Sequence, residues 1–312
     1  MFKVFITRRL PSIAHKILSE NFKVDYSDEN SPLSISRLKE VATQYDAILC
    51  TVSEKIDSHI LSNCDKLKVI SNYGTGLDNI DCKLAKSKGI AVYNTPDIVT
   101  NSTADLTLAL LLNLVRKIDS ARQFVLEDKW KSWNPEIFVG EELNDKIFGI
   151  WGFGKIGLAV ARRAESFGLR IKYYNHSKIT APKIDKYVSV ELKELLETSD
   201  FLSIHLSLNE KTHSIVNKEV FQSLTKRPIL LNLSRGEIVD TNSLLWALKK
   251  GKIRGVALDV TSPEPISGNH QLCKLDNCII VPHIGTATKE CRLEMAKLAA
   301  QNILNHFNTI NE

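Results

Sequence analysis

Residues 151–157 read Trp-Gly-Phe-Gly-Lys-Ile-Gly, a Gly-x-Gly-x-x-Gly stretch whose flanking segments indicate the type of fold. An apolar strand signal at 147–151 precedes it, and a helical pattern follows it, with apolar positions at Ile156, Val160, Ala164 and Phe167. In such a strand–turn–helix unit, Gly152 permits the tight turn, Gly154 lets the backbone approach a pyrophosphate, and Gly157 lets the helix pack on the strand. The helix N-terminus offers N–H groups and a positive dipole end to the phosphates. The stretch predicts a dinucleotide site, although a Gly-rich turn without a ligand has the same pattern.

Short apolar runs alternate with helical patterns on both sides of this stretch. The later strand signals fall at 147–151, 169–174, 201–206, 229–233, 256–259 and 278–281. The earlier ones fall at 4–6, 22–26, 47–50, 68–71 and 90–93. Alternation of this kind predicts an α/β protein with parallel sheets covered by helices, and the later strands fit a doubly wound dinucleotide-binding fold. We expect a long helix over 101–127 between the two regions and a last helix over 289–307.

Size and composition set further limits. The 312 residues suggest two domains. A hydrophobic fraction of 43% with 25% charged residues is typical of a globular chain and excludes a disordered or collagen-like one. The net charge of +5 is too small to indicate nucleic-acid binding by itself. The longest apolar run, Leu106–Val115, is about half a membrane span and predicts a buried helix, so we expect no membrane partner.

The cysteines and the N-terminus point to the cytoplasm. The six cysteines are scattered, contain no C-x-x-C pair, and have no cluster of His or Cys that would complete a metal site. We therefore expect reduced thiols and no metal. The first residues contain no charged region leading into an apolar run with a cleavage site, so we expect no secretory signal.

The strand after the glycine-rich stretch ends in Asn175-His176-Ser177-Lys178. An Asp or Glu at this place would bond a ribose 2′-hydroxyl and repel a 2′-phosphate, and none is present. Asn175 and Ser177 are able to donate hydrogen bonds, and Lys178 is cationic. The loop therefore predicts a preference for NADP, with NAD as the alternative.

Three later strand ends each carry a polar residue that a plain structural segment does not need. They are Arg235 in Leu231–Gly236, Glu264 in Leu258–Pro265, and His283 in Val281–Thr286. Singly, they have ordinary explanations: a surface ion pair, a solvated loop charge and a histidine without special role. Because the carboxyl ends of parallel strands meet at one edge of a sheet, we expect the three to converge. Together they supply a carboxylate anchor, a general acid/base and a carboxylate to orient it.

These segments carry a resemblance to a known family. Gly-x-Gly-x-x-Gly, Asn-Leu-Ser-Arg-Gly-Glu-Ile-Val-Asp, Leu-Asp-Val-x-x-x-Glu-Pro and Pro-His-Ile-Gly-Thr-Ala-Thr resemble the signatures of the D-isomer-specific 2-hydroxyacid dehydrogenases. The resemblance extends to the first half through residues 72–81 and 94–97. Within the family the chain is most similar to the glyoxylate/hydroxypyruvate reductases, as shown by Thr-Ala-Asp at 103–105 and by the loop without a carboxylate at 175–178.

The resemblance implies roles for single residues. Arg235 would hold the substrate carboxylate and carbonyl oxygen, His283 would be the proton donor in ketoacid reduction, and Glu264 would hydrogen-bond His283 and favour its charged form. In the first domain, the N–H groups of Thr75 and Gly76 would bind the substrate carboxylate, and Ser53 would line the pocket. The implied cofactor contacts are Thr103, Gly152, Gly154, Lys155, Ile156, Gly157, Asn175, His176, Ser177, Leu233, Asp259 and Gly285.

One departure from the family pattern lies after the fourth strand of the cofactor domain. The family often has His-x-Pro-Leu there, and this chain has His205-Leu206-Ser207-Leu208. Replacing the proline by Ser207 is expected to loosen a loop on the adenine side.

The resemblance also implies an architecture and an activity. Both domains would be doubly wound: a flavodoxin-like substrate domain formed by 1–100 and a returning helix in 285–312, and a Rossmann dinucleotide-binding domain at 101–284. The helix over 101–127 and the segment Trp130–Phe138 would form a homodimer contact. The expected reaction is reduction of glyoxylate or hydroxypyruvate to the D-2-hydroxyacid by NAD(P)H. The alternatives are a D-3-phosphoglycerate dehydrogenase and a dinucleotide-sensing interaction protein of the same fold.

Overall fold

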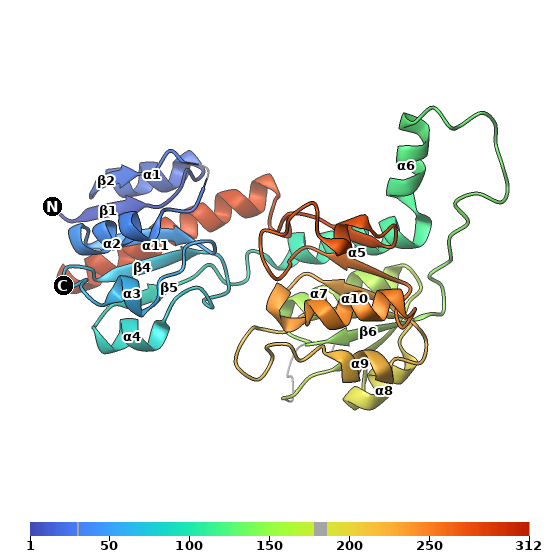
Figure 1. Ribbon diagram of the computed structural model, residues 1–312. Coiled ribbons are helices and arrows are strands. Elements are labelled where there is room, and N and C mark those ends of the chain that lie inside the picture. Colours follow the sequence, from blue (N-terminus) through green and yellow to red (C-terminus); the bar gives the residue numbers. More distant parts are fainter. Residues whose placement is uncertain (30, 178–185, 312) are drawn as a thin grey trace. The chain divides into compact units, whose positions relative to one another are not determined.

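The computed structural model describes residues 1–29, 31–177 and 186–311. The chain forms two compact units, drawn in Figure 1: unit 1 is Met1–Val99 with Thr286–Glu312, and unit 2 is Thr100–Gly285. Each unit is built on a parallel sheet with helices packed on it, which confirms the predicted α/β class with two parallel-sheet domains.

Unit 1 contains a five-stranded sheet in the order β2-β1-β3-β4-β5. The strands are β1 (Lys3–Ile6), β2 (Lys23–Tyr26), β3 (Ala47–Thr51), β4 (Val69–Tyr73) and β5 (Ala91–Tyr93). The helices are α1 (Ser12–Ser19), α2 (Ile35–Gln44), α3 (Ser58–Leu61), α4 (Cys82–Ser87) and α11 (Lys289–Asn311). Every residue of β3 and β4 is buried, as expected for central parallel strands covered on both faces. The order reverses direction between β1 and β3, and ligands of open α/β sheets bind at the carboxyl ends beside such a point.

The last helix, α11, belongs to unit 1. It packs on α1 and β4. Ser71 Oγ donates a hydrogen bond to the carbonyl oxygen of Ala299 at 2.8 Å, and the rings of Phe2 and Phe307 stack with centroids 4.3 Å apart. The helix therefore completes a core that the first 99 residues begin.

Unit 2 contains a seven-stranded parallel sheet in the order β12-β11-β10-β9-β6-β7-β8. The strands are β6 (Ile147–Trp151), β7 (Arg170–Tyr174), β8 (Val188–Ser189), β9 (Phe201–Ile204), β10 (Ile229–Asn232), β11 (Gly255–Leu258) and β12 (Cys278–Ile280). The six strands predicted for this region are all present. β8 was not predicted, because a two-residue exposed edge strand leaves no apolar run in the sequence.

Both faces of this sheet are covered by helices, namely α5 (Thr100–Arg116), α7 (Lys155–Ser166), α8 (Leu192–Thr198), α9 (Lys218–Ser223) and α10 (Thr241–Lys249). Unit 2 also contains α6 (Ile118–Leu126) and the short 3₁₀ turns η1 (Gly236–Ile238) and η2 (Gln271–Lys274). Successive residues of β10 enter different cores: Leu231 packs in the one beneath α5 and α7, and Leu230 in the other.

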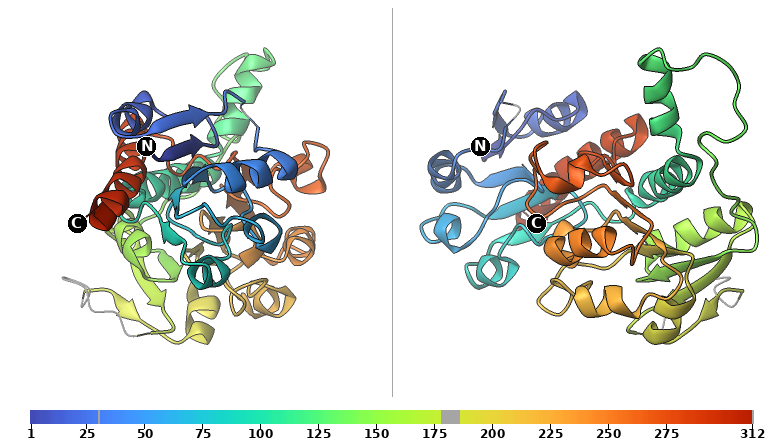
Figure 2. Two further views of the ribbon diagram at one scale, coloured as in Figure 1. Left: turned by 90° about the vertical axis from the view of Figure 1, so that its left-hand side faces the viewer. Right: turned by 45° about the vertical axis from the view of Figure 1, so that its right-hand side comes forward.

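The expectation of one long helix over 101–127 is wrong. Lys117 adopts a left-handed conformation with φ 53°, so α5 ends and α6 starts in a new direction. The side chain of Asn113 accepts a hydrogen bond from the N–H of Asp119 at 2.9 Å, which satisfies a donor that a continuous helix would have used. α6 has no buried residue and stands off from the rest of unit 2 in Figures 1 and 2.

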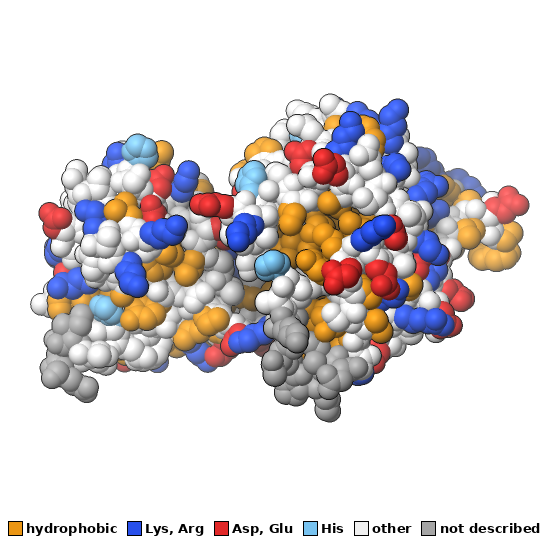
Figure 3. Space-filling model, turned by 90° about the horizontal axis from the view of Figure 1, so that it is seen from below, with side chains coloured by type: hydrophobic (Ala, Val, Ile, Leu, Met, Phe, Trp, Pro, Cys, Tyr) orange, Lys and Arg blue, Asp and Glu red, His pale blue; other side chains and the backbone are white. Residues whose placement is uncertain are grey.

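The surface is mixed in charge. On the face drawn in Figure 3, Lys and Arg side chains alternate with Asp and Glu side chains, and apolar areas lie between them. In the described part of the chain, no helix combines the length and the hydropathy that crossing a membrane requires.

Candidate functional site

The glycine-rich stretch has the geometry of a phosphate cradle. Gly152 has φ +95°, and a Cβ there would lie 2.4 Å from the carbonyl oxygen of His205. A Cβ on Gly157 would lie 2.4 Å from the carbonyl oxygen of Gly152, so only glycine allows this close packing. A Cβ on Gly154 would meet nothing within 4 Å, which leaves open space beside the N-terminus of α7. That space and the first N–H groups of the helix, which starts at Lys155 and Ile156, fit a pyrophosphate.

The end of β7 is tied to this stretch. Oδ1 of Asn175 accepts a hydrogen bond from the N–H of Phe153 at 3.0 Å, and its Nδ2 donates to the carbonyl oxygen of Ser177 at 2.8 Å. Asn175 is half-buried, whereas His176 and Ser177 are exposed. Lys178, which carried part of the prediction of NADP, lies outside the described residues. No carboxylate stands at 175–177.

The loop after β9 is held by its own side chains. The carbonyl oxygen of Ser207 accepts hydrogen bonds from Thr212 Oγ1 at 2.7 Å and from Asn209 Nδ2 at 3.3 Å. These hydrogen bonds restrain the loop at the position where the family often has a proline.

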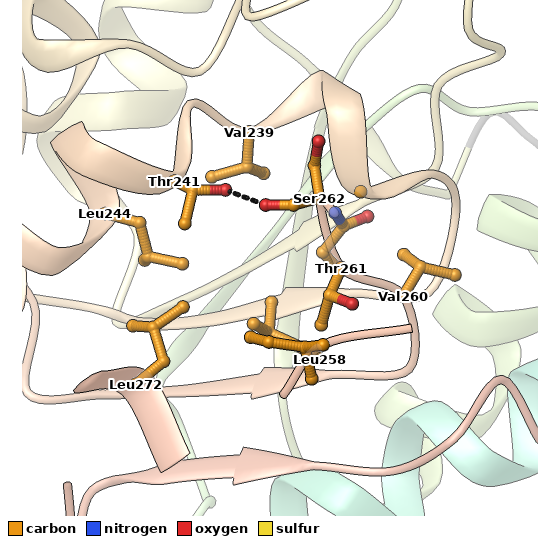
Figure 4. A pocket seen from close by; sticks show the side chains of 11 residues that line it. Val239, Thr241, Leu244, Leu258, Val260, Thr261, Ser262 and Leu272 are labelled. Carbon is orange, nitrogen blue, oxygen red and sulfur yellow. Dashed lines mark hydrogen bonds between the residues drawn. The ribbon is translucent and has the colours of Figure 1, made fainter. Parts of the chain in front are cut away.

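Arg235 and Glu264 lie on two loops that are locked together. A Cβ on Gly236 would lie 2.0 Å from the carbonyl oxygen of Thr261, so the backbones touch at that glycine. Thr241 Oγ1 donates to the carbonyl oxygen of Ser262 at 2.7 Å, as Figure 4 shows. The loop after β10 and the loop after β11 therefore move as one body.

Asn232 fixes the backbone around Arg235. The asparagine is fully buried at the end of β10. Its Nδ2 donates to the carbonyl oxygen of Arg235 at 2.9 Å, and its Oδ1 accepts from Ser234 N at 3.1 Å and Ser234 Oγ at 2.7 Å. Asn232 was not among the predicted site residues, although an amide within an apolar strand is a visible signal.

His283 and Glu264 form an acid–base pair. Nδ1 of His283 lies 2.7 Å from Oε1 of Glu264, with both side chains partly exposed. Partial burial raises the pKa of the Glu264 carboxyl, but the hydrogen bond and charge of His283, the N–H of Thr261 and the charge of Arg235 together bring that pKa below its ordinary value. Glu264 is thus an anion near neutral pH. Because the charge of Arg235 contributes to the lowered pKa, the guanidinium lies near the Glu264 carboxylate.

Asp259 holds the backbone that carries His283. His283 has φ 53°, a left-handed conformation that is rare outside glycine. Its N–H donates to the carbonyl oxygen of Asp259 at 2.9 Å. The carboxylate of Asp259 accepts from the N–H groups of Ile284 at 2.6 Å and Gly285 at 2.8 Å. Burial raises the pKa of this carboxyl, against the effect of those donors and of His283.

The four remaining cofactor contacts expected in unit 2 are buried: Thr103, Leu233, Asp259 and Gly285. Thr103 Oγ1 donates to the carbonyl oxygen of Gly285 at 3.4 Å, and a Cβ on Gly285 would lie 2.8 Å from Asp259 Oδ2, so Thr103, Asp259 and Gly285 lie together. The side chain of Leu233 packs in the core beneath α5 and α7, which leaves only its backbone for a cofactor.

Two hollows lie beside the locked loops, and neither is lined by the acid–base pair or by Arg235. The first has room for about one water and is mainly apolar, with residues such as Val239, Leu244, Leu258 and Leu272 around it (Figure 4). The second has a volume of about 400 Å³ and runs past His213, Glu237 and Asp240. Among the described residues, no group of three or more His, Cys, Asp or Glu side chains is arranged to hold a metal ion.

The substrate contacts expected in unit 1 lie on two loops of its sheet. Ser53 follows β3, and Thr75 and Gly76 follow β4. The N–H groups of Thr75 and Gly76 donate no hydrogen bond to another described residue. Both loops are at the carboxyl ends of their strands, the edge at which α/β sheets bind ligands.

Similar proteins are found among family models and curated sequences. Residues 108–285 match the model described as "D-isomer specific 2-hydroxyacid dehydrogenase, NAD binding domain". The chain is 40% identical over 309 residues to a glyoxylate reductase of Pyrococcus furiosus, covering 97% of this chain and 91% of that one. It is also 40% identical over 313 residues to a glyoxylate reductase of Thermococcus litoralis, covering 97% and 92%.

Solved structures agree with these matches. A protein of Thermus thermophilus superposes with a TM-score of 0.89 at 37% identity, covering 97% of this chain and 96% of that one. An NADPH-dependent glyoxylate/hydroxypyruvate reductase of Sinorhizobium meliloti, in complex with NADP and malonate, gives a TM-score of 0.87 at 27% identity, covering 98% and 94%. The stretch at 152–157 lies inside the part of the chain that matches the NAD-binding domain, and the matches support a nicotinamide dinucleotide as the cofactor. With the motifs, the fold and the relatives in agreement, the chain belongs to the D-isomer specific 2-hydroxyacid dehydrogenase family.

Proposed function

We propose that this protein reduces small 2-ketoacids with a reduced nicotinamide dinucleotide, glyoxylate to glycolate and hydroxypyruvate to the D-2-hydroxyacid glycerate. The observation that carries the proposal is the 2.7 Å pair between His283 and Glu264, in which Glu264 lies on a loop locked to that of Arg235. A proton donor, its anionic partner and a carboxylate-binding cation are the set that ketoacid reduction requires. The relatives named glyoxylate reductase at 40% identity support the choice of a small 2-ketoacid.

Each residue has a distinct task in this scheme. The bound dinucleotide supplies the hydride. Arg235 binds the substrate carboxylate with its guanidinium fork. His283 donates a proton from Nε2 to the carbonyl oxygen, since Nδ1 is held by Glu264. The N–H groups of Thr75 and Gly76 bind the carboxylate as neutral donors, with Ser53 beside them.

NADPH is the preferred cofactor in this proposal. The support is the absence of a carboxylate at 175–177, where an Asp or Glu would repel a 2′-phosphate. The NADP complex of the Sinorhizobium meliloti protein is consistent with it.

The protein is proposed to act as a homodimer in the cytoplasm. Large apolar side chains of α6 and the segment after it are exposed, which is unusual for a surface that stays in water; they are Ile118, Val125, Leu126, Trp130, Trp133 and Val139. A mass of one chain by light scattering would contradict the dimer.

The proposed location in the cytoplasm is supported by the cysteines. All six are free, as a reducing compartment requires.

A substrate panel tests the activity. Oxidation of NADPH and of NADH is followed with glyoxylate, hydroxypyruvate and 3-phosphohydroxypyruvate. We expect turnover of the first two ketoacids, little with the phosphorylated one, and almost none in His283→Gln. Failure of the wild type to reduce any 2-ketoacid with either cofactor would overturn the proposal, and a preference for the phosphorylated ketoacid would replace the substrate.

A further inference from the structure

The two substrate loops of unit 1 touch each other. A Cβ on Gly74, in the loop after β4, would lie 2.4 Å from Cγ1 of Val52, in the loop after β3. A displacement of one loop must therefore displace the other. The contacts that fix these two loops therefore determine the positions of Ser53, Thr75 and Gly76.

Glu54 fixes the loop after β3 from inside. Its side chain has no exposed surface. Oε2 accepts hydrogen bonds from the N–H and from Oγ1 of Thr51, both at 2.7 Å. Oγ1 of Thr51 in turn accepts from the N–H of Ser53 at 3.3 Å. Oε1 faces the guanidinium of Arg8 at 3.4 Å, so the buried anion has a cation beside it.

Asn79 joins this loop to the next one. Its Nδ2 donates to the carbonyl oxygens of Thr51 at 3.1 Å and Glu54 at 3.0 Å. Its side chain also lies 3.4 Å from the amide of Asn72, whose Nδ2 donates to the carbonyl oxygen of Gly76 at 2.7 Å. The two carboxamides, that of Asn79 and that of Asn72, therefore link the backbone on both sides of Ser53 to the backbone of Gly76.

The opposite side of the second loop is held as well. Asn94 Nδ2 donates to the carbonyl oxygen of Thr75 at 2.7 Å, and Thr75 Oγ1 donates to the carbonyl oxygen of Thr95 at 2.9 Å. These bonds use the carbonyl and hydroxyl groups and leave the N–H groups of Thr75 and Gly76 to a ligand. Amides that bind an anion act best when their direction is fixed beforehand.

We propose that Glu54 and Asn79 are positioning residues for ketoacid binding: they hold the loops after β3 and β4 in the one arrangement that presents Ser53 and the N–H groups of Thr75 and Gly76. Neither side chain touches the substrate in this proposal, which rests on the proposed function. Arg8 acts behind Glu54 by neutralising it.

Steady-state kinetics of Asn79→Ala tests the proposal. We expect the KM for glyoxylate to rise about tenfold or more, since small misplacements of binding groups have such effects. The Kd of NADPH should stay within about twofold, because the network lies wholly in unit 1 and the cofactor cradle in unit 2. Glu54→Ala should act in the same way, and Glu54→Gln, which keeps an acceptor for Thr51, should recover much of the KM.

Asp81→Ala is the matched control. Asp81 lies two residues from Asn79 and caps α4 by accepting from the N–H of Leu84 at 2.9 Å, without a side-chain bond to either loop. We expect it to lower the Tm and leave the KM unchanged. Equal KM values in Asn79→Ala and Asp81→Ala would overturn the positioning role.

Hydrogen exchange separates this inference from the activity. In Asn79→Ala, peptides covering 51–55 and 72–78 should exchange faster than in Asp81→Ala, with unit 2 unaffected. Unchanged exchange in both peptides would overturn the inference whatever the kinetics. If Asn79→Ala exchanges faster but the wild type reduces no ketoacid, the loop network is supported. The proposed function, and the ketoacid as the ligand of these loops, are then overturned.

Discussion

Nδ1 of His283 lies 2.7 Å from Oε1 of Glu264 while its N–H is bonded to the carbonyl oxygen of Asp259 at 2.9 Å. The imidazole ring is therefore held through Nδ1, and the backbone of His283 is held through its N–H. Nε2 is the ring nitrogen that remains to donate a proton to a substrate. A left-handed histidine persists only where its surroundings hold it, and here two hydrogen bonds from the following N–H groups to Asp259 do so.

Glu264→Gln tests the partnership by its pH dependence. The pKa of Glu264 lies below its ordinary value, so the group is an anion near neutral pH, and its charge lies beside Nδ1 of the ring that donates the proton in the proposed reaction. Glutamine at this position has no charge. The rate of ketoacid reduction should then start to fall at lower pH than in the wild type, and kcat at neutral pH should drop about 10- to 100-fold. Profiles of kcat against pH decide, with Glu210→Gln, an exposed change of the same kind, as control.

Arg235→Ala should remove ketoacid turnover and leave the dinucleotide bound. Loss of a charged hydrogen-bonding anchor is expected to lower kcat/KM at least about 100-fold. Titration of NADPH fluorescence should show a Kd close to that of the wild type and of the exposed control Arg162→Ala. A parallel loss of cofactor affinity would assign Arg235 to the support of the fold.

Asn175→Asp should reverse the cofactor preference. The aspartate keeps an oxygen to accept from the N–H of Phe153 but loses the donor to the carbonyl oxygen of Ser177, and it adds a charge that repels a 2′-phosphate. We expect the ratio of kcat/KM for NADPH to kcat/KM for NADH to fall about tenfold or more, because one added negative charge repels the 2′-phosphate at short range. A wild type that already prefers NADH tenfold would refute this interpretation of the loop.

Gly154→Ala and Gly157→Ala should separate binding from folding. An added Cβ at 154 meets open space, so the Tm should be unchanged while NADPH affinity falls, because the methyl group occupies room beside the phosphates. At 157 the Cβ would lie 2.4 Å from the carbonyl oxygen of Gly152, so the Tm should fall as well. Calorimetry and cofactor titration of both variants provide the comparison.

His205 should make the fold sensitive to mild acid. Burial lowers its pKa from 6.5 to about 4, and its Nε2 lies 2.8 Å from Ser203 Oγ. Between these pH values the unfolded chain binds the extra proton, so stability falls as the pH drops, on the order of 1 kcal/mol per pH unit. The loss that comes from Glu264 begins as the pH falls into the ordinary carboxyl range and continues down to its lowered pKa, so it follows that of His205 on acidification. Denaturant unfolding of His205→Gln from pH 7 to 4 should show a flatter profile.

The fold was predictable to a large extent because it follows from short-range signals. Apolar runs placed eleven of the strands, and glycine spacing located the cradle. The break at Lys117 was not predictable from periodicity, because Leu108, Leu111 and Val115 continue a helical pattern up to it. The break depends on the bond between Asn113 and Asp119, which periodicity does not contain.

The candidate site was predictable only in part, for a similar reason. Arg235, Glu264 and His283 were visible as polar residues after strands. The groups that hold them were not: Asn232, the carboxylate oxygens of Asp259 and the glycine contact at Thr261 act through bonds between segments that the sequence does not show to be neighbours.

The return of α11 to unit 1 has a consequence for synthesis on the ribosome. Ser71 finds its partner Ala299 only after 228 further residues have been made. Unit 2 is continuous and is able to fold while the chain is still growing, whereas the first 99 residues must wait with an apolar surface of their sheet uncovered. During that interval the nascent chain is open to aggregation and to capture by chaperones, because contacts between residues so far apart in the sequence form late and slowly.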